Sequence, residues 1–265
     1  MFWFKRPGLQ PGVKRPTIFT SSITSKITLG NRPHIISAVF GSLALIGMLY
    51  TPWLVLVETS IEVNMGLAQK IFYYHAPSAW MMFLGFFICF IYSLLYLWKR
   101  TRKYDIYASC AAEVGLLFCV LVMLSGPLWA KPVWNAWWVW DAQLTLVVVM
   151  FLIFLSYMML KSYSEESIQS ARFRAVLAII GFMNVPLIHY AVQLWRTHHP
   201  TVMREGGGGL PPDMRSALYI CALVWLCLFI AIYSRRVSLE RAKEELAYLQ
   251  AEVRDRKSIL GQMAE

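Results

Sequence analysis

Charged side chains are scarce in this sequence of 265 residues. Asp, Glu, Lys and Arg together make up 15% of the chain, whereas they make up about 25% of soluble proteins. Hydrophobic residues make up 58%, and the mean hydropathy is +0.51. A soluble fold of this size cannot hide so much apolar side chain, because its surface needs polar cover. The scarcity of charge therefore excludes a disordered chain and a cytosolic enzyme, and it indicates an integral membrane protein.

Motifs of conventional active sites are also missing. The five cysteines all lie in apolar runs, and none forms a CxxC or another metal-binding spacing. We interpret them as small buried hydrophobic residues. The chain contains no P-loop, nucleophile elbow, zinc protease motif or pair of catalytic carboxylates.

Six apolar segments have the length needed to cross a bilayer, about 20 residues. Lipid offers no partner for unpaired backbone groups, so such segments must be helices. The sequence therefore predicts an all-α integral membrane protein with six transmembrane helices. The segments are 35–57, 79–98, 108–128, 142–160, 174–194 and 217–233.

The distribution of Lys and Arg predicts the orientation. Twenty of the 25 basic residues lie in the N-terminal arm, the loops after the second and fourth spans, and the C-terminal tail. Basic residues collect on the cytoplasmic side of a membrane. We therefore expect both termini to be cytoplasmic and the loops 58–78, 129–141 and 195–216 to face the other side. The basic arm has no signal-peptide core, so we expect no cleavage.

The chain divides into three regions. We expect a basic cytoplasmic arm over 1–34, a membrane domain over 35–233 and a cytoplasmic tail over 234–265. In the tail, apolar residues from Leu239 to Val253 recur at alternating three- and four-residue steps, which predicts an amphipathic helix lying on the cytoplasmic surface or on a partner subunit. Four glycines at 206–209 indicate a flexible joint in the last external loop.

Tryptophan is concentrated in the segment 126–145, GPLWAKPVWNAWWVWDAQLT. An interfacial aromatic belt explains one or two tryptophans per helix end, but not this density. A rigid apolar wall favours a flat aromatic ligand. We expect Asp141 to cap the fourth span. The five tryptophans of the segment are Trp129, Trp134, Trp137, Trp138 and Trp140.

Two histidines lie at the same depth, on the side of the membrane that carries the tryptophans. His75 lies at the start of the second span, and His189 lies in the outer part of the fifth. A lone histidine there is more often a hydrogen-bonded structural residue than a ligand. Ionisable groups at membrane depth, however, usually mark a site. Two neutral imidazoles on either side of a planar cofactor are a recognised way to hold haem iron.

Four other ionisable residues have simpler interpretations. His198 and His199 are adjacent in the chain and make a poor chelate, so we interpret them as part of a solvated loop. His34 lies on the cytoplasmic side. Glu113 lies within the third span, where a structural hydrogen bond is the first interpretation and a functional role remains open.

Three motifs in this order resemble one family. WAKPVWNAWWVWDAQLT resembles the tryptophan-rich WWD segment of haem-handling proteins in cytochrome c maturation. YYHAPSAW before the second span and NVPLIHYAVQLW in the fifth are similar to the cytochrome c maturation protein C family, also called haem exporter protein C, as is PPDMRSALY at the sixth. The resemblance covers residues 70–220.

The resemblance implies a site, a cofactor and partners. It implies that His75 and His189 are the axial iron ligands of non-covalent haem b, and that Trp129 to Asp141 hold the porphyrin. It also implies a multi-pass protein of the bacterial inner membrane whose site faces the periplasm. The implied partners are a periplasmic haem chaperone (maturation protein E), a small one-helix subunit and ATP-binding cassette transporter subunits, with membrane lipid around the helices and no nucleic acid.

The segment departs from the family pattern at two positions. Ala130 stands where the family is expected to have glycine, which is a minor steric change. Gln143 stands where relatives often have arginine, so a cation that would pair with a haem propionate is absent from this position.

The resemblance implies that the protein presents haem to the chaperone. We expect this to be haem delivery that assists covalent attachment of haem to the chaperone, and not enzymatic catalysis by this chain. A transporter that moves haem across the bilayer is one alternative, although transport folds tend to have midplane sites and broken helices. A cytochrome c haem lyase-like subunit is another, although such relatives are larger. A purely structural aromatic scaffold is the last, and an absorption spectrum separates it from the others.

Overall fold

The computed structural model describes residues 19–163, 167–194 and 210–264. Within these ranges the chain is helical and contains no β-strand. Two short helices, the π-helix η1 (Leu54–Glu58) and the 3-10 helix η2 (Leu67–Ile71), connect the first two long helices. The long helices are α1 (Phe19–Trp53), α2 (Phe72–Lys99), α3 (Arg102–Trp134), α4 (Ala142–Tyr163), α5 (Ile168–Leu194) and α6 (Pro212–Ala264).

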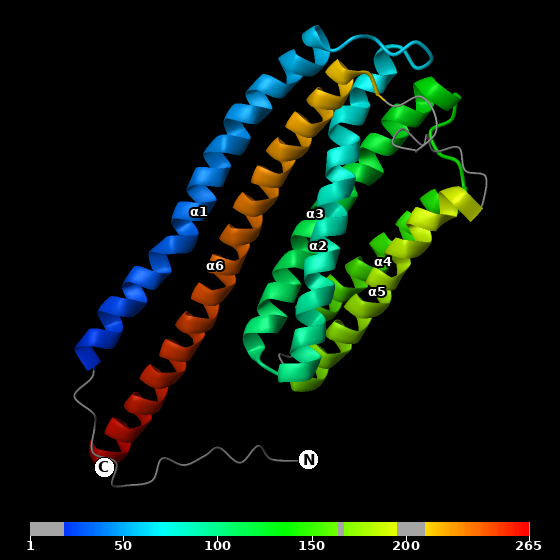
Figure 1. The fold of residues 1–265 in the computed structure, drawn as a ribbon. Coiled ribbons are helices and arrows are strands. Elements are labelled where there is room, and N and C mark those ends of the chain that lie inside the picture. Colours follow the sequence, from blue (N-terminus) through cyan, green and yellow to red (C-terminus); the bar gives the residue numbers. More distant parts are fainter. Residues whose placement is uncertain (1–18, 164–166, 195–209, 265) are drawn as a thin grey trace.

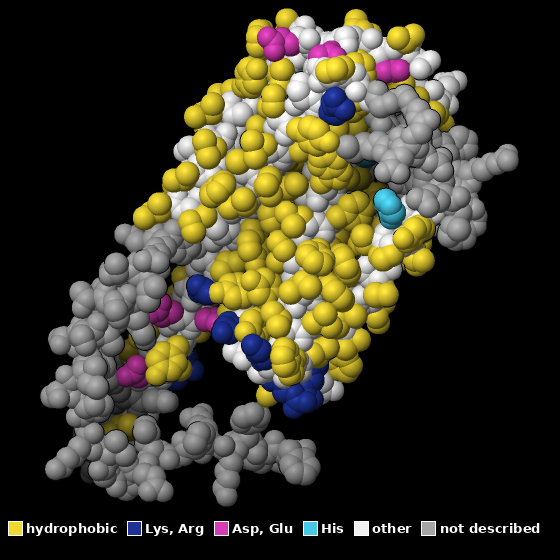
Figure 2. Space-filling model, viewed as in Figure 1, with side chains coloured by type: hydrophobic (Ala, Val, Ile, Leu, Met, Phe, Trp, Pro, Cys, Tyr) yellow, Lys and Arg dark blue, Asp and Glu magenta, His cyan; other side chains and the backbone are white. Residues whose placement is uncertain are grey.

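Six of these helices contain a stretch long and apolar enough to cross a membrane. The prediction of an all-α protein with six spans is therefore confirmed. Figure 2 shows apolar side chains over the middle of one face, with Lys and Arg gathered mainly toward its lower end. Because lipid tails favour apolar surface, this face suits a bilayer.

The helices form three neighbouring pairs (Figure 1). α2 packs against α3, α4 against α5, and α1 against α6. The α2–α3 contact requires glycine on both sides, because a Cβ at Gly85 would lie 2.6 Å from the Cα of Gly115. Small residues of this kind let transmembrane helices approach closely, and this contact fixes the spacing of the two helices that flank the candidate site.

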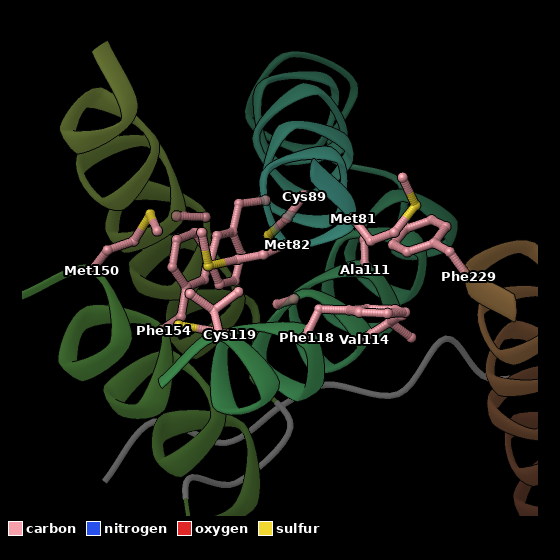
Figure 3. Close-up of a cluster of buried hydrophobic side chains, with 14 of the residues drawn as sticks. Met81, Met82, Cys89, Ala111, Val114, Phe118, Cys119, Met150, Phe154 and Phe229 are labelled. Atoms are coloured by element: carbon pink, nitrogen blue, oxygen red, sulfur yellow. The ribbon is translucent and has the colours of Figure 1, made fainter. Parts of the chain in front are cut away.

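The main apolar core lies between α2, α3, α4, α5 and α6. Figure 3 shows Met82, Cys119 and Phe154, from three different helices, meeting in this cluster. Phe154 also stacks on Phe86 with ring centroids 3.7 Å apart. The five cysteines are unpaired, and four of them are buried, in agreement with their interpretation as small hydrophobic residues.

We call the two ends of the bundle the tryptophan end, where α2 and α4 begin and α3 and α5 end, and the basic end opposite. At the tryptophan end a polar cluster fastens the loop after α1. The Lys70 ammonium, 5% exposed, donates to the Thr59 carbonyl at 2.7 Å, and the Asp213 carboxylate accepts from the Ser60 hydroxyl at 2.6 Å. The loop is thereby bound to α6 and η2.

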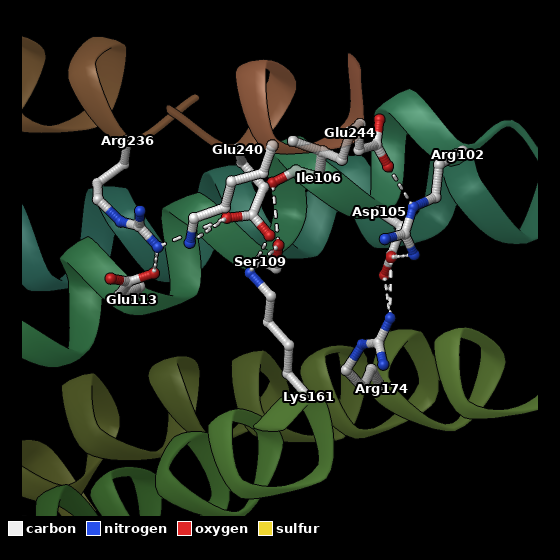
Figure 4. Close-up of polar contacts among 11 residues, drawn as sticks. Arg102, Asp105, Ile106, Ser109, Glu113, Lys161, Arg174, Arg236, Glu240 and Glu244 are labelled. Atoms are coloured by element: carbon white, nitrogen blue, oxygen red, sulfur yellow. Dashed lines mark hydrogen bonds and ion pairs between the residues drawn. The ribbon is translucent and has the colours of Figure 1, made fainter. Parts of the chain in front are cut away.

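At the basic end, ion pairs bind the tail to the bundle (Figure 4). α6 runs without a break through residue 234, the predicted start of the tail, so the amphipathic tail continues the sixth span as one helix. Arg236 donates to Glu113 at 2.5 Å, which supports a structural role for that carboxylate. The other two contacts are Lys161–Glu240 at 3.3 Å and Arg102–Glu244 at 2.7 Å.

One ion pair at this end is buried. Arg174 of α5 donates to both carboxylate oxygens of Asp105 in α3, at 3.0 and 2.8 Å, and also to the hydroxyl of Ser170 at 2.9 Å. Only 3% of Arg174 and 5% of Asp105 is exposed. Because unpaired buried charges are costly, this pair holds α3 and α5 in one relative position.

Candidate functional site

The topology brings the predicted site residues to one end of the molecule. His75 is in the first turns of α2, and His189 is in the last turns of α5. The tryptophan segment joins the end of α3 to the start of α4. Because these helices alternate in direction, all three features lie at the tryptophan end.

The tryptophan segment is more helical than the sequence indicated. We expected a loop from Trp129, because the third apolar span ends at residue 128. Instead, α3 continues through Pro127 and Pro132 to Trp134 and ends at Asn135, whose φ is +57°. The extra turns are stabilised by packing, since Trp129 lies in a buried apolar cluster with Phe72 and Met214.

His75 is buried between α2 and α3. It is 8% exposed, and its Nδ1 lies 2.8 Å from the Ser125 hydroxyl. The Trp129 ring lies 5.7 Å from the imidazole at an angle of 55°. A Cβ at Gly126 would lie 3.6 Å from Cε1 of His75. The imidazole is therefore enclosed on the α3 side.

The five tryptophans do not form a single wall. Trp129 is 4% exposed and packs behind His75, and Trp134 is half-buried at the end of α3. Trp137 and Trp140 are 58% and 73% exposed. Trp138 is half-buried and meets Trp140 edge to face, with ring centroids 5.7 Å apart. The open aromatic surface is thus formed by the last three, which we call the aromatic loop (Trp137–Trp140).

Asp141 caps α4 as predicted. Its Oδ1 accepts a hydrogen bond from the Leu144 amide at 2.8 Å, and its carbonyl accepts from the Thr145 amide at 3.0 Å. A side-chain oxygen in this position satisfies an amide that the helix leaves unpaired. The cap also fixes the point at which the aromatic loop enters α4.

Two buried polar atoms flank this cap without a hydrogen-bond partner among the described residues, namely Nε1 of Trp138 and Oε1 of Gln143. Buried polar atoms normally have a partner. One is a donor and the other an acceptor, and each lacks a partner that a ligand group of the opposite kind would supply.

His189 occupies a different environment from His75. It is exposed on α5, and its ring meets Tyr190 edge to face at 5.6 Å. The adjacent Ile188 is buried. The structure thus places the two histidines at the same end in different surroundings, with the His75 ring beside Trp129 and the His189 ring beside Tyr190.

The remaining histidines do not contribute to this geometry. His34 lies away from the tryptophan end, and its Nδ1 is 2.5 Å from a guanidinium nitrogen of Arg235 on α6. His198, His199 and the glycines 206–209 lie outside the described residues. Within the described ranges, no group of three His, Cys, Asp or Glu side chains is arranged to hold a metal ion.

Sequence reasoning missed Ser125. Its hydroxyl contacts His75 and also donates to the Leu121 carbonyl at 2.6 Å. The available signal was its position four residues before Trp129, because residues at this spacing share one face of a helix.

Comparisons with known proteins point to one family. Residues 23–252 match the family model described as heme exporter protein C. The heme exporter protein C of Bradyrhizobium diazoefficiens is 34% identical over 195 residues, which are 72% of this chain and 74% of the relative. That of Paracoccus denitrificans is 29% identical over 196 residues, covering 73% and 81%. A putative cytochrome c biosynthesis ccmC-like mitochondrial protein of Marchantia polymorpha is 30% identical over 160 residues, covering 60% and 68%.

Proposed function

The chain belongs to the haem exporter protein C family, and on this premise we propose that it binds haem at the periplasmic face of the bacterial inner membrane and presents it to a periplasmic haem chaperone. The observation on which the proposal rests is the pairing of an enclosed histidine, His75, with an open aromatic loop at the same end of the bundle.

The residues at the tryptophan end fit haem. A porphyrin brings its own four nitrogen ligands, so the protein has only to supply axial ligands. We propose that His75 and His189 supply them to non-covalent haem b. The apolar faces of the aromatic loop suit the porphyrin plane. The indole N–H of Trp138 suits the propionate carboxylates at the polar edge of the ring, because a carboxylate accepts hydrogen bonds.

The geometry also supports a division of roles. Trp129 is a packing residue behind the ligand histidine, whereas Trp137 and Trp140 are accessible to a docking protein. The axial histidines hold the iron, and the aromatic loop presents the porphyrin. We therefore propose a delivery component that assists covalent attachment of haem to the chaperone, rather than an enzyme with a nucleophile of its own.

We further propose that the basic end is cytoplasmic and that the tail contacts the partner subunits. Beyond Glu244 the tail exposes an apolar stripe in which Leu246, Leu249 and Val253 are each at least 50% exposed. A stripe at this spacing is typical of helix-to-helix contacts. The small one-helix subunit and the ATP-binding cassette subunits are the partners that the family suggests.

Reporter fusions test the orientation. We expect fusions after residues 65, 135 and 205 to report the periplasm, and fusions after residues 103, 167 and 250 to report the cytoplasm, because the basic residues predict a cytoplasmic location for both termini. Paired alkaline phosphatase and fluorescent protein fusions measure this. A cytoplasmic signal at residue 135 would overturn the proposed site.

Substitutions in the aromatic loop separate holding haem from presenting it. We expect Trp137→Ala, Trp138→Ala and Trp140→Ala to leave much of the haem bound, because neighbouring tryptophans share the contact, but to reduce transfer to the chaperone sharply. Asp141→Ala is expected to act similarly by loosening the cap, which is worth about 1 kcal/mol. Haem content of the purified variant is measured beside the yield of haem-loaded chaperone from the same cells.

The control for this experiment is Trp98→Ala. Trp98 is 78% exposed near the end of α2, at the basic end, so its removal changes exposed aromatic surface away from the site and is expected to leave both measurements unchanged. Equal losses of haem content and transfer in the loop variants would mean that the loop only binds haem. Normal transfer with Trp138 and Trp140 both replaced would exclude a presenting role.

A further inference from the structure

The hydroxyl of Ser125 faces Nδ1 of His75. The two atoms are 2.8 Å apart, and they belong to different helices, α3 and α2. Ser125 Oγ also lies 2.6 Å from the Leu121 carbonyl oxygen and 3.4 Å from that of Val122. The hydroxyl thus lies between the imidazole and the backbone of its own helix.

This arrangement determines where the protons lie. A serine hydroxyl has one proton to donate and can accept with its lone pairs. A carbonyl oxygen can only accept, so the short contact to Leu121 uses the hydroxyl proton. Ser125 Oγ then accepts from the imidazole, which places a proton on Nδ1 of His75. In the neutral ring the acceptor lone pair is consequently on Nε2.

We propose that Ser125 is a positioning residue that holds His75 as its Nδ1–H tautomer and so directs Nε2 to the haem iron. The inference rests on the proposed function, because it concerns how the axial ligand is prepared. Histidine ligands commonly donate their second N–H to a neighbouring acceptor, which fixes the ring and raises its basicity.

The surroundings of His75 make this positioning effective. The Trp129 ring restricts rotation of the imidazole, and Gly126 leaves room for a Cβ beside Cε1, which would lie 3.6 Å away. The close approach of Gly85 to Gly115 fixes the distance between α2 and α3. Because both helices are held, the hydrogen bond between Ser125 and His75 does not depend on a flexible loop.

Haem titration of the purified, haem-stripped protein tests the role of Ser125. We expect Ser125→Ala to weaken haemin binding about 10- to 100-fold, as removal of such a partner does at other metal sites. We also expect the reduction potential of the bound haem to rise, because a less basic imidazole stabilises ferric iron less. Ser125→Thr keeps the hydroxyl and is expected to restore both values.

The matched control is Ser156→Ala. Ser156 on α4 donates to the Leu152 carbonyl at 2.8 Å, so it makes the same backbone hydrogen bond as Ser125, and its removal is expected to change neither value. His75→Ala is measured in parallel. If it leaves the axial signature intact, the proposed ligand is wrong; if it removes the signature while Ser125→Ala behaves as the unchanged protein, only the positioning role is wrong. Failure of Ser125→Thr to restore the potential also contradicts the inference.

Discussion

Replacement of His75 with alanine is expected to abolish the low-spin spectrum of bis-histidine haem in the purified protein. His189→Ala is expected to do the same, because loss of either axial imidazole leaves the iron with one strong protein ligand. The two variants differ in their structural cost. His75 is buried and His189 is exposed, so His189→Ala tests ligation with less disturbance of packing. Absorption and electron paramagnetic resonance spectra measure the outcome.

His34→Ala is the control for both variants, since His34 lies away from the tryptophan end and contacts Arg235. The proposed pair is incorrect if His198→Ala or His199→Ala removes the low-spin spectrum while His189→Ala keeps it. Retention of the spectrum in both proposed variants would falsify bis-histidine ligation by this pair.

The largest expected loss of stability follows from breaking the buried ion pair between Asp105 and Arg174. Arg174→Ala leaves a carboxylate that is 5% exposed without its main partner, which costs about 3 kcal/mol. The contact of Asp105 with Arg102 at 3.0 Å compensates in part, so the loss is expected at the lower end of the range for buried pairs. The midpoint of denaturant unfolding in micelles measures the change.

Two variants identify the cause of that loss. Arg172→Ala removes an exposed arginine from the same helix and is expected to change the free energy of unfolding by less than about 0.5 kcal/mol. Replacing both partners, Asp105→Leu with Arg174→Met, is expected to recover most of the stability, because apolar residues of similar volume can replace a buried ion pair. A double variant no more stable than Arg174→Ala would mean that helix packing, and not an unpaired charge, caused the loss.

The features that the sequence predicted well depend on local or additive properties. Six spans follow from hydropathy, since backbone hydrogen bonding in lipid admits only helices here. The cap by Asp141 follows from its place directly before an apolar helix. Glu113 was expected to take part in a structural hydrogen bond, and its contact with Arg236 agrees with this.

The features that the sequence did not predict depend on contacts between distant residues. The apolar span predicted the end of α3 before Trp129, but packing against Phe72 and Met214 extends the helix. Asp105 and Arg174 are far apart in the chain, and no sequence motif around either residue indicates that they form an ion pair. The burial of Trp129 and the exposure of Trp140 differ for the same reason, because neighbouring tryptophans in one segment face different surroundings.

The unbroken course of α6 has a mechanical consequence. Its 53 residues span about 80 Å at 1.5 Å per residue, far more than the hydrocarbon thickness of about 30 Å. In its first turn, Asp213 accepts a hydrogen bond from Ser60 in the loop after α1. Farther along the same helix, Glu244 accepts a hydrogen bond from Arg102. The helix is therefore fastened to opposite ends of the bundle at two points, its first turn and Glu244, and the residues after Glu244 extend beyond the second point. Because the helix is continuous between these two points, a force on the arm beyond Glu244 is transmitted to the Asp213 contact through helical backbone alone.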